Sequence, residues 1–378
     1  MIKRILAILM VLALFVALFA GCGQTVTTST AKPEPAAETS AAAPAPETSP
    51  SETREFTDSC GRTVTLPSKI TKIAVSGPLT QLYVLPLCPE LMVGFASDFS
   101  EDASLYIKNE YLALPKLGQL YGGKGTMDLE ALLAAGPDVV IDVGEAKGSI
   151  VEDMDALTNQ TGIPFVHIDA TVTTAGDAYR MLGELTGKAE KANELASWCE
   201  SAYTDITAMM AKVDADGARK SLLYCLGDKG INVIAEGSFH AQTINMLSKN
   251  LATLSEVASS GMGNEVDLEQ ILLWNPEVII FSPNSIYDTV GSDTAWQQLS
   301  AISSGNYFKV PDGPYGWVSS PPSVQCYLGM LWLGALLYPD YVDYDLQTEV
   351  TGYYKLFYDC DLSAEMYRNL TADSLSAA

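Results

Sequence analysis

Short, uninterrupted apolar runs alternate with stretches of helical periodicity along most of this chain. Runs of this length, rich in Val and Ile, are typical of strands buried on both faces of a parallel sheet. The predicted buried strands lie at 70–75, 91–95, 139–143, 165–168, 221–227, 231–237, 277–283 and 307–310. Strands separated by helices in this way predict an α/β fold with mostly parallel sheets.

One helical stretch is longer than the others. Between residues 189 and 213 the apolar positions recur at steps of three and four, at Ala192, Leu195, Cys199, Ala202, Ile206, Met209 and Val213. This spacing predicts one amphipathic helix roughly 37 Å long. An ordinary helix within one lobe fits the same pattern. We favour two α/β lobes joined by this rigid helix, because about 320 residues exceed a typical single core.

The amino-terminal residues have the layout of a secretory signal peptide. Lys3 and Arg4 precede an apolar run, 5–20, that is shorter than the roughly 20 residues of a membrane-spanning helix. Small residues then precede Cys22, as in the lipobox of bacterial lipoproteins, so we predict that Cys22 is lipidated. An uncleaved signal anchor is the alternative.

The predicted organisation has five parts. They are a signal peptide at 1–21, a lipidated cysteine and disordered Ala/Pro/Ser/Thr linker at 22–52, an N-terminal α/β lobe at 53–172, a connecting helical segment at 173–215, and a C-terminal α/β lobe with two closing helices at 216–378. The linker has no aromatic residue and cannot bury a core. We therefore expect an extracytoplasmic domain held near a membrane by its lipid, in either a monoderm or a diderm envelope.

Charge and cysteine content narrow the classes of partner. The formal net charge is −24, which makes nucleic acid an improbable partner. The six cysteines beyond Cys22 are scattered singly, so no zinc or cluster spacing exists. One or two disulfides or buried free thiols both remain compatible with the sequence.

An internal repeat relates the two predicted lobes. Residues 127–141, MDLEALLAAGPDVVI, match residues 266–280, VDLEQILLWNPEVII, at seven of fifteen positions. Each copy predicts an Asp-capped helix, a break at proline and a buried strand. Glu130 and Glu269 occupy the same place in the first helical turn, where the helix dipole favours a carboxylate. They serve helix stability alone, or they form a two-point acidic contact for a basic partner.

These phrases, with FTDSCGRTVTLPSKITKIAV, LGQLYGG and the long helix, resemble the ABC-importer binding proteins for cobalamin, ferric siderophores and haem. The resemblance covers nearly all of the chain from about Arg54 onward. It implies a ligand in a cleft between two lobes joined by a rigid helix, and a monomer that delivers this ligand to a permease with its ATPase. It also implies that Glu130 and Glu269 dock into arginine pockets of the permease.

The candidate ligand-binding residues lie in loops at predicted strand ends. They are Ser76, Tyr121, Lys229, His240, Tyr315 and Trp317. For the aromatic residues and His240, packing in the core is the competing interpretation.

Few residues in these loops suit a bare metal ion or a strongly anionic ligand. The chain has only two histidines, and no arginine falls in the loops, which argues against a dedicated zinc site and a bidentate arginine clamp. We expect no resident cofactor or metal site and a metal chelate as ligand: an iron complex, haem or cobalamin. An oxyanion such as molybdate or tungstate is the alternative.

Enzymatic function is less consistent with these residues. The phosphate-loop-like segment from Gly118 to Gly125 has Gly125 where a Ser or Thr should bind magnesium. No G-x-S-x-G or H-E-x-x-H motif occurs. A secreted enzyme with a carboxylate pair stays open as a less favoured alternative.

Overall fold

The computed structural model describes residues 52–121 and 126–375. The predicted α/β architecture with mostly parallel sheets is confirmed in them. The signal peptide, Cys22 and nearly all of the linker lie outside the described residues, so these predictions remain predictions. No helix in the described part of the chain combines the length and apolar character needed to cross a membrane.

A two-stranded hairpin precedes the first parallel sheet. Strands β1 (Thr53–Thr57) and β2 (Thr63–Pro67) pair antiparallel around a turn in which Gly61 has a φ of 76°. The buried Asp58 carboxylate accepts bonds from the backbone N–H of Cys60 and from the Arg62 guanidinium. Arg62 also donates to the carbonyl of Phe165 at 2.7 Å, which ties the hairpin to the sheet.

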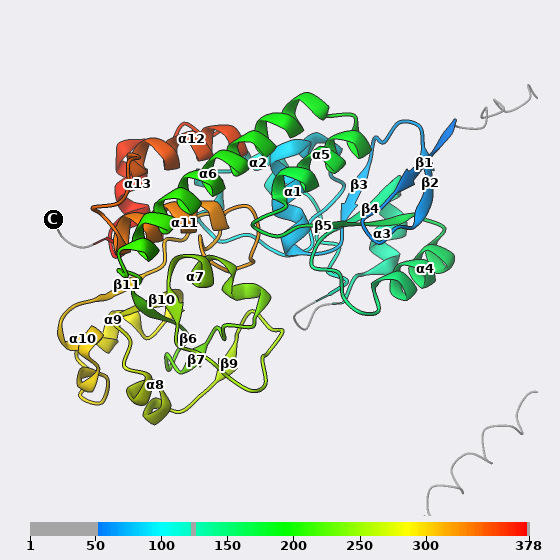
Figure 1. Cartoon of the computed structure of the whole chain (residues 1–378). Helices are drawn as coiled ribbons and strands as arrows, with labels where there is room; N and C mark the ends of the chain where they lie inside the picture. Colours follow the sequence, from blue (N-terminus) through cyan, green and yellow to red (C-terminus); the bar gives the residue numbers. More distant parts are fainter. Residues whose placement is uncertain (1–51, 122–125, 376–378) are drawn as a thin grey trace, which may run out of the picture. The chain divides into compact units, whose positions relative to one another are not determined.

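The first parallel sheet has three strands in the order β3-β4-β5 (Figure 1). These are β3 (Ile73–Val75), β4 (Val139–Gly144) and β5 (Phe165–Asp169). The helices of this lobe are α1 (Pro78–Leu87), α2 (Asn109–Leu112), α3 (Leu129–Ala135), α4 (Ile150–Thr161) and α5 (Ala175–Thr186). The prediction of a strand at 91–95 is wrong. This segment makes only isolated bridges, Ile73 with Met92 and Phe95 with Lys116. A short 3-10 turn, Pro89–Leu91, takes up the first residue of the segment, so it cannot extend as a strand from there.

The long helix predicted from apolar spacing is α6 (Ala189–Ala215), green in Figure 1. Its 27 residues span about 40 Å. All seven apolar positions on which the prediction rested are buried. It packs against α5 on the side of the first sheet and against α11 (Cys326–Leu337) on the side of the second.

The second sheet is mixed and follows the order β11-β10-β6-β7-β9, with β8 beside β6. Strands β6, β8, β10 and β11 run parallel, whereas β7 and β9 are antiparallel additions. The strands are β6 (Ser221–Gly227), β7 (Asn232–Val233), β8 (Lys249–Asn250), β9 (Asn264–Glu265), β10 (Val278–Ser285) and β11 (Tyr307–Lys309). The helices are α7 (Gln242–Leu247), α8 (Leu268–Trp274), α9 (Tyr287–Val290) and α10 (Ser300–Ser303).

Three closing helices follow where the periodicity predicts two: α11, α12 (Leu346–Tyr358) and α13 (Ala364–Thr371). Helix α12 packs against α1 of the first lobe. One hydrophobic core includes side chains from both sheets, from α6 and from the closing helices. Since close-packed interiors resist deformation, this shared core limits relative motion of the two lobes.

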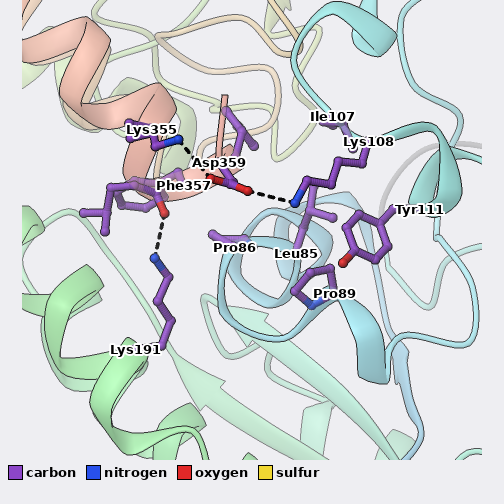
Figure 2. Close-up of a pocket in the computed structure, with 12 residues that line it drawn as sticks. Leu85, Pro86, Pro89, Ile107, Lys108, Tyr111, Lys191, Lys355, Phe357 and Asp359 are labelled. Carbon is purple, nitrogen blue, oxygen red and sulfur yellow. Dashed lines mark hydrogen bonds and ion pairs between the residues drawn. The ribbon is translucent and has the colours of Figure 1, made fainter. Parts of the chain in front are cut away.

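Ion pairs reinforce the contact between α12 and the first lobe (Figure 2). A surface cavity of about 210 Å³ separates them. Lys108 and Lys355 both reach the Asp359 carboxylate, at 2.8 and 3.1 Å, and Lys191 of α6 donates to the carbonyl of Leu356. The two lysines hold the pKa of Asp359 down at about 2. Because the three ammonium groups already have partners, we assign this cavity a structural role.

Candidate functional site

A different cavity, of about 340 Å³, lies where the carboxyl ends of β3 and β4 meet loops of the second lobe. Parallel strands bring their carboxyl ends to one edge, which is the usual ligand position in such sheets. The first lobe supplies the residues 76–80, 119, 121, 142–145 and 147. The second lobe supplies residues 239, 240, 259–261, 321 and 322. The cavity is therefore built jointly by both lobes.

A chain of hydrogen bonds forms the floor of this cavity. The Ser76 hydroxyl donates to the buried Asp142 carboxylate, and His167 Nδ1 lies 2.7 Å from its other oxygen. His167 Nε2 lies 2.9 Å from Asp169. Burial lowers the pKa of His167, but the two carboxylates more than offset this effect and raise it. The floor thus pairs a buried carboxylate with a buried imidazole.

Thr80 joins this network from the first turn of α1. Its Oγ1 accepts the backbone N–H of Val143 at 2.8 Å and lies 3.1 Å from the Ser76 hydroxyl. Because Ser76 donates to Asp142, the Thr80 proton is directed to Ser76. Both hydroxyl protons are therefore used inside the protein, and neither is available to a ligand.

The mouth of the cavity in the first lobe is polar. The Tyr121 hydroxyl donates to Asp153 at 2.9 Å, and desolvation together with this bond raises the pKa of Tyr121. Lys147 pairs with Glu145 at 2.8 Å, with both side chains largely exposed. Exposed pairs of this kind are weak, so Lys147 can turn towards a ligand at little cost.

The wall in the second lobe combines the apolar Phe239, Pro321 and Pro322 with Ser259, Ser260 and Gly261. His240 is its main ionisable group. Its Nδ1 lies 3.0 Å from the Ser319 hydroxyl and 3.3 Å from the Ser319 carbonyl. Burial lowers the pKa of His240, so the imidazole is neutral at pH 7. Ser319 thus engages Nδ1, and no hydrogen bond of Nε2 is found among the described residues.

The structure brings together three of the six predicted ligand residues, Ser76, Tyr121 and His240. Tyr315 instead lines an adjoining cavity of about 300 Å³, which shares Gly261 with the first. Trp317 is fully buried and lies outside the lining of both cavities. Lys229 is exposed on the turn after β6 and also lies outside them.

Sequence reasoning missed Asp142 and Lys147 as members of this site, whereas Thr80 falls in a loop, 76–80, that was expected to line the cleft. Asp142 had a usable signal: a single carboxylate inside the apolar run VVIDV, where an unpaired charge is costly. Its partner His167 lies in a different strand. Only the pairing of β4 with β5 places the two side chains together.

Glu130 and Glu269 lie apart from the cavity, in the first turns of α3 and α8. Both are exposed and make no ion pair with any other residue in the described ranges. Within residues 52–121 and 126–375, no group of three or more His, Cys, Asp or Glu side chains is arranged to hold a metal ion. The six cysteines described there are free.

Comparison with known proteins places this geometry in context. A family model described as periplasmic binding protein matches residues 98–313. An ABC transporter solute binding protein from Sulfurospirillum deleyianum is 27% identical, with a TM-score of 0.78, over 84% of this chain and 99% of that one. No curated protein matches.

Two more distant solved structures share the fold. The molybdate periplasmic binding protein MolA of Haemophilus influenzae, bound to molybdate, is 21% identical with a TM-score of 0.66. The alignment covers 82% of this chain and 99% of that one. CeuE of Helicobacter pylori, in a Ni-His complex, is 15% identical with a TM-score of 0.63, over 84% and 99%.

Proposed function

Because this chain belongs to the periplasmic binding protein family, in which a binding protein captures a small ligand outside the cytoplasm for an ABC importer, we propose that its own ligand is a metal chelate. The observation that carries this proposal is the His240 imidazole on the wall of the cavity, with Nδ1 bonded to Ser319 and no hydrogen bond of Nε2 to any residue that the structure describes. A neutral histidine whose second nitrogen is held by such a bond is the usual form of a metal ligand. We also propose that the protein is anchored through lipidated Cys22.

The rest of the cavity supports a chelate with an apolar body. Phe239, Pro321 and Pro322 form a surface against which such a body packs, while Tyr121 and Lys147 supply polar contacts at the mouth. This mixture is typical of small-molecule pockets. The volume of about 340 Å³ is near the lower end for such pockets. It favours a compact iron complex over haem and cobalamin within the proposed class.

An oxyanion is the second candidate, and one observation favours it. Gly77, Pro78 and Leu79, at the amino end of α1, line the cavity, and a helix start attracts anions. MolA, which shares the fold, was solved with molybdate. Against this candidate, the protons of Ser76 and Thr80 are already used, and Asp142 places a carboxylate in the floor. We therefore rank the oxyanion below the chelate.

The test is a binding titration of the chain from Pro50 onward, which forms one compact unit. The ligands are several ferric siderophores, haem, cobalamin, molybdate and tungstate, followed by calorimetry and by the absorption band of each metal complex. We expect saturable binding of one iron chelate and a spectral shift that His240→Ala abolishes.

The matched control is Lys229→Ala, which removes a polar side chain outside the cavity and should leave affinity unchanged. Binding of molybdate or tungstate alone would replace the chelate with the oxyanion. Chelate binding that is indifferent to His240→Ala would remove the metal-contact role of this residue.

For hand-off to the importer, we propose that Glu130 and Glu269 dock on the permease. Their exposure, their lack of ion-pair partners among the described residues and their duplication on two lobes support this role.

A further inference from the structure

Large apolar side chains that are exposed to solvent are few in the described part of the chain. They are Leu105, Leu133, Val257, Met262 and Leu273. Two of them, Leu133 and Leu273, lie on the repeated helices α3 and α8, and Leu273 is the most exposed of the set at 79%. Single exposed leucines are ordinary, but the position of these two next to the repeated glutamates requires an explanation.

Each leucine shares a helix face with its glutamate. Leu133 follows Glu130 by three residues and Leu273 follows Glu269 by four, and both spacings make side chains neighbours on a helix. The opposite face of each helix is anchored by Leu132 or Ile271, which are fully buried. The same carboxylate-and-leucine pair therefore projects from both lobes.

The two leucines do not correspond in the sequence repeat. Leu133 aligns with Leu272, which is only partly exposed, and Leu273 aligns with Ala134. Leu133 and Leu273 therefore flank their glutamates on different sides. What the two helices share is one exposed leucine beside the repeated glutamate.

We infer that Leu133 and Leu273 are apolar anchors of the permease-docking surface, each entering a pocket beside the basic group that receives Glu130 or Glu269. This inference rests on the proposed importer function. The partner it describes presents the same site twice, a cationic side chain next to an apolar pocket. The exposed carboxylates of Glu130 and Glu269 and the chain's net charge of −24 favour such a basic surface.

An anionic membrane surface is a poorer occupant for these side chains. It would repel the neighbouring carboxylates, and single leucines on two separate helices do not form the continuous apolar face of an interfacial helix. A desolvated apolar anchor surrounded by polar contacts is instead typical of protein interfaces.

The first experiment uses the full-length chain in its host, with the photo-crosslinking residue p-benzoyl-phenylalanine at position 133 or 273. Position 105 is the control, because Leu105 is 58% exposed on the same molecule but lies on neither repeated helix. We expect adducts at 133 and 273 with a multi-span permease that co-purifies with an ABC ATPase, and none at 105. Adducts with lipid alone, no adducts, or the same adduct at 105 would overturn the inference.

The second experiment measures affinity for the permease complex isolated in this way. Leu133→Ser with Leu273→Ser should weaken binding about a hundredfold, since each leucine lost from a buried contact costs about tenfold. Leu105→Ser should change nothing, and an unchanged melting temperature shows that folding is intact.

Charge reversal separates failure of this inference from failure of the proposed function. Glu130→Arg with Glu269→Arg should abolish both complex formation and uptake without changing ligand affinity, whereas Glu110→Arg, in the first turn of α2, should have no effect. If only the glutamate variants lose binding, the docking proposal stands and the leucine anchors are wrong. If neither pair matters, both are wrong.

Discussion

The two copies of the repeat form the same unit and then diverge at the next residue. In both, an aspartate caps a short helix, through Asp128 on α3 and Asp267 on α8. In both, the helix leads through a proline into a buried strand. Directly after the repeat, the first lobe has Asp142 and the second has Phe281. Asp142 bonds Ser76 and His167, whereas Phe281 packs among Tyr287, Trp296 and Tyr307.

This difference shows how a duplicated scaffold divides its tasks. The strand end of the first lobe carries a polar network that reaches the cavity, while that of the second consolidates its own core. The acidic residue after the proline keeps one role in both copies. Asp138 accepts backbone bonds from Thr71 and Lys72, and Glu277 accepts one from Ser221, so each ties down the neighbouring strand.

The largest effect on stability is expected at Phe281 in β10. Phe281→Ala removes a fully buried ring and should lower the free energy of unfolding by about 3–4 kcal/mol. Phe281→Leu, which keeps most of the volume, should cost less than half of that. Urea unfolding of both variants measures the loss, and ligand titration below the transition should show unchanged affinity. A loss under about 1 kcal/mol for Phe281→Ala would contradict the assigned packing role.

A smaller stability effect, coupled to pH, is expected at the polar strand end. Asp142→Ala leaves Ser76 and His167 without their shared acceptor, which should cost about 2–3 kcal/mol near pH 6. Because the folded pKa of His167 is raised, its contribution is fully present below its unfolded value of about 6.5 and is lost as pH rises through the folded pKa. Compared with the parent chain, Asp142→Ala should therefore lose most stability below about pH 6.5, where the contribution of His167 is fully present.

Three measurements check the Asp142 prediction. Unfolding curves from pH 5 to 8 should show a weaker pH dependence in Asp142→Ala than in the parent chain, and NMR titration should show a lower pKa for His167. Ligand affinity should also change, unlike in Phe281→Ala. An identical His167 titration in variant and parent would refute the coupling.

The smallest effect on stability is expected from exchanging the residues that end helices α3 and α8. Gly136 and Asn275 both adopt left-handed backbone, with φ of 58° and 38°. Gly136→Asn should change the free energy of unfolding by less than about 0.5 kcal/mol, because Asn tolerates this conformation. Asn275→Gly should cost about 1 kcal/mol, since the Asn275 side chain also accepts bonds from Ser300. Thermal unfolding of both variants tests this asymmetry, and equal losses would contradict it.

Prediction from the sequence worked best where a local pattern determines a local structure. The spacing of apolar residues located α6, and the repeat located α3, α8 and their strands, because periodicity depends on which face a helix or strand buries. It worked less well for 91–95, where Met92 and Phe95 are buried but the segment makes only isolated bridges. An apolar segment can be buried without pairing in a sheet, because pairing also requires a neighbouring strand beside it.

The candidate site illustrates the same limit. Three candidates from loops at strand ends, Ser76, Tyr121 and His240, line the same cavity. For Trp317, however, an aromatic residue in a proline-rich loop gave no indication that the side chain is fully buried. A side chain's direction in an irregular loop depends on packing partners far away in the chain.

The sequence by itself determined the α/β class, the duplicated helix–strand unit and the paired glutamates, because these follow from short-range periodicity, capping and repetition. Only the tertiary structure decided that Asp142 meets His167 and that residues of both lobes, His240 among them, line one cavity. These relations join residues distant in sequence, and they arise from strand order and helix packing that no local pattern contains.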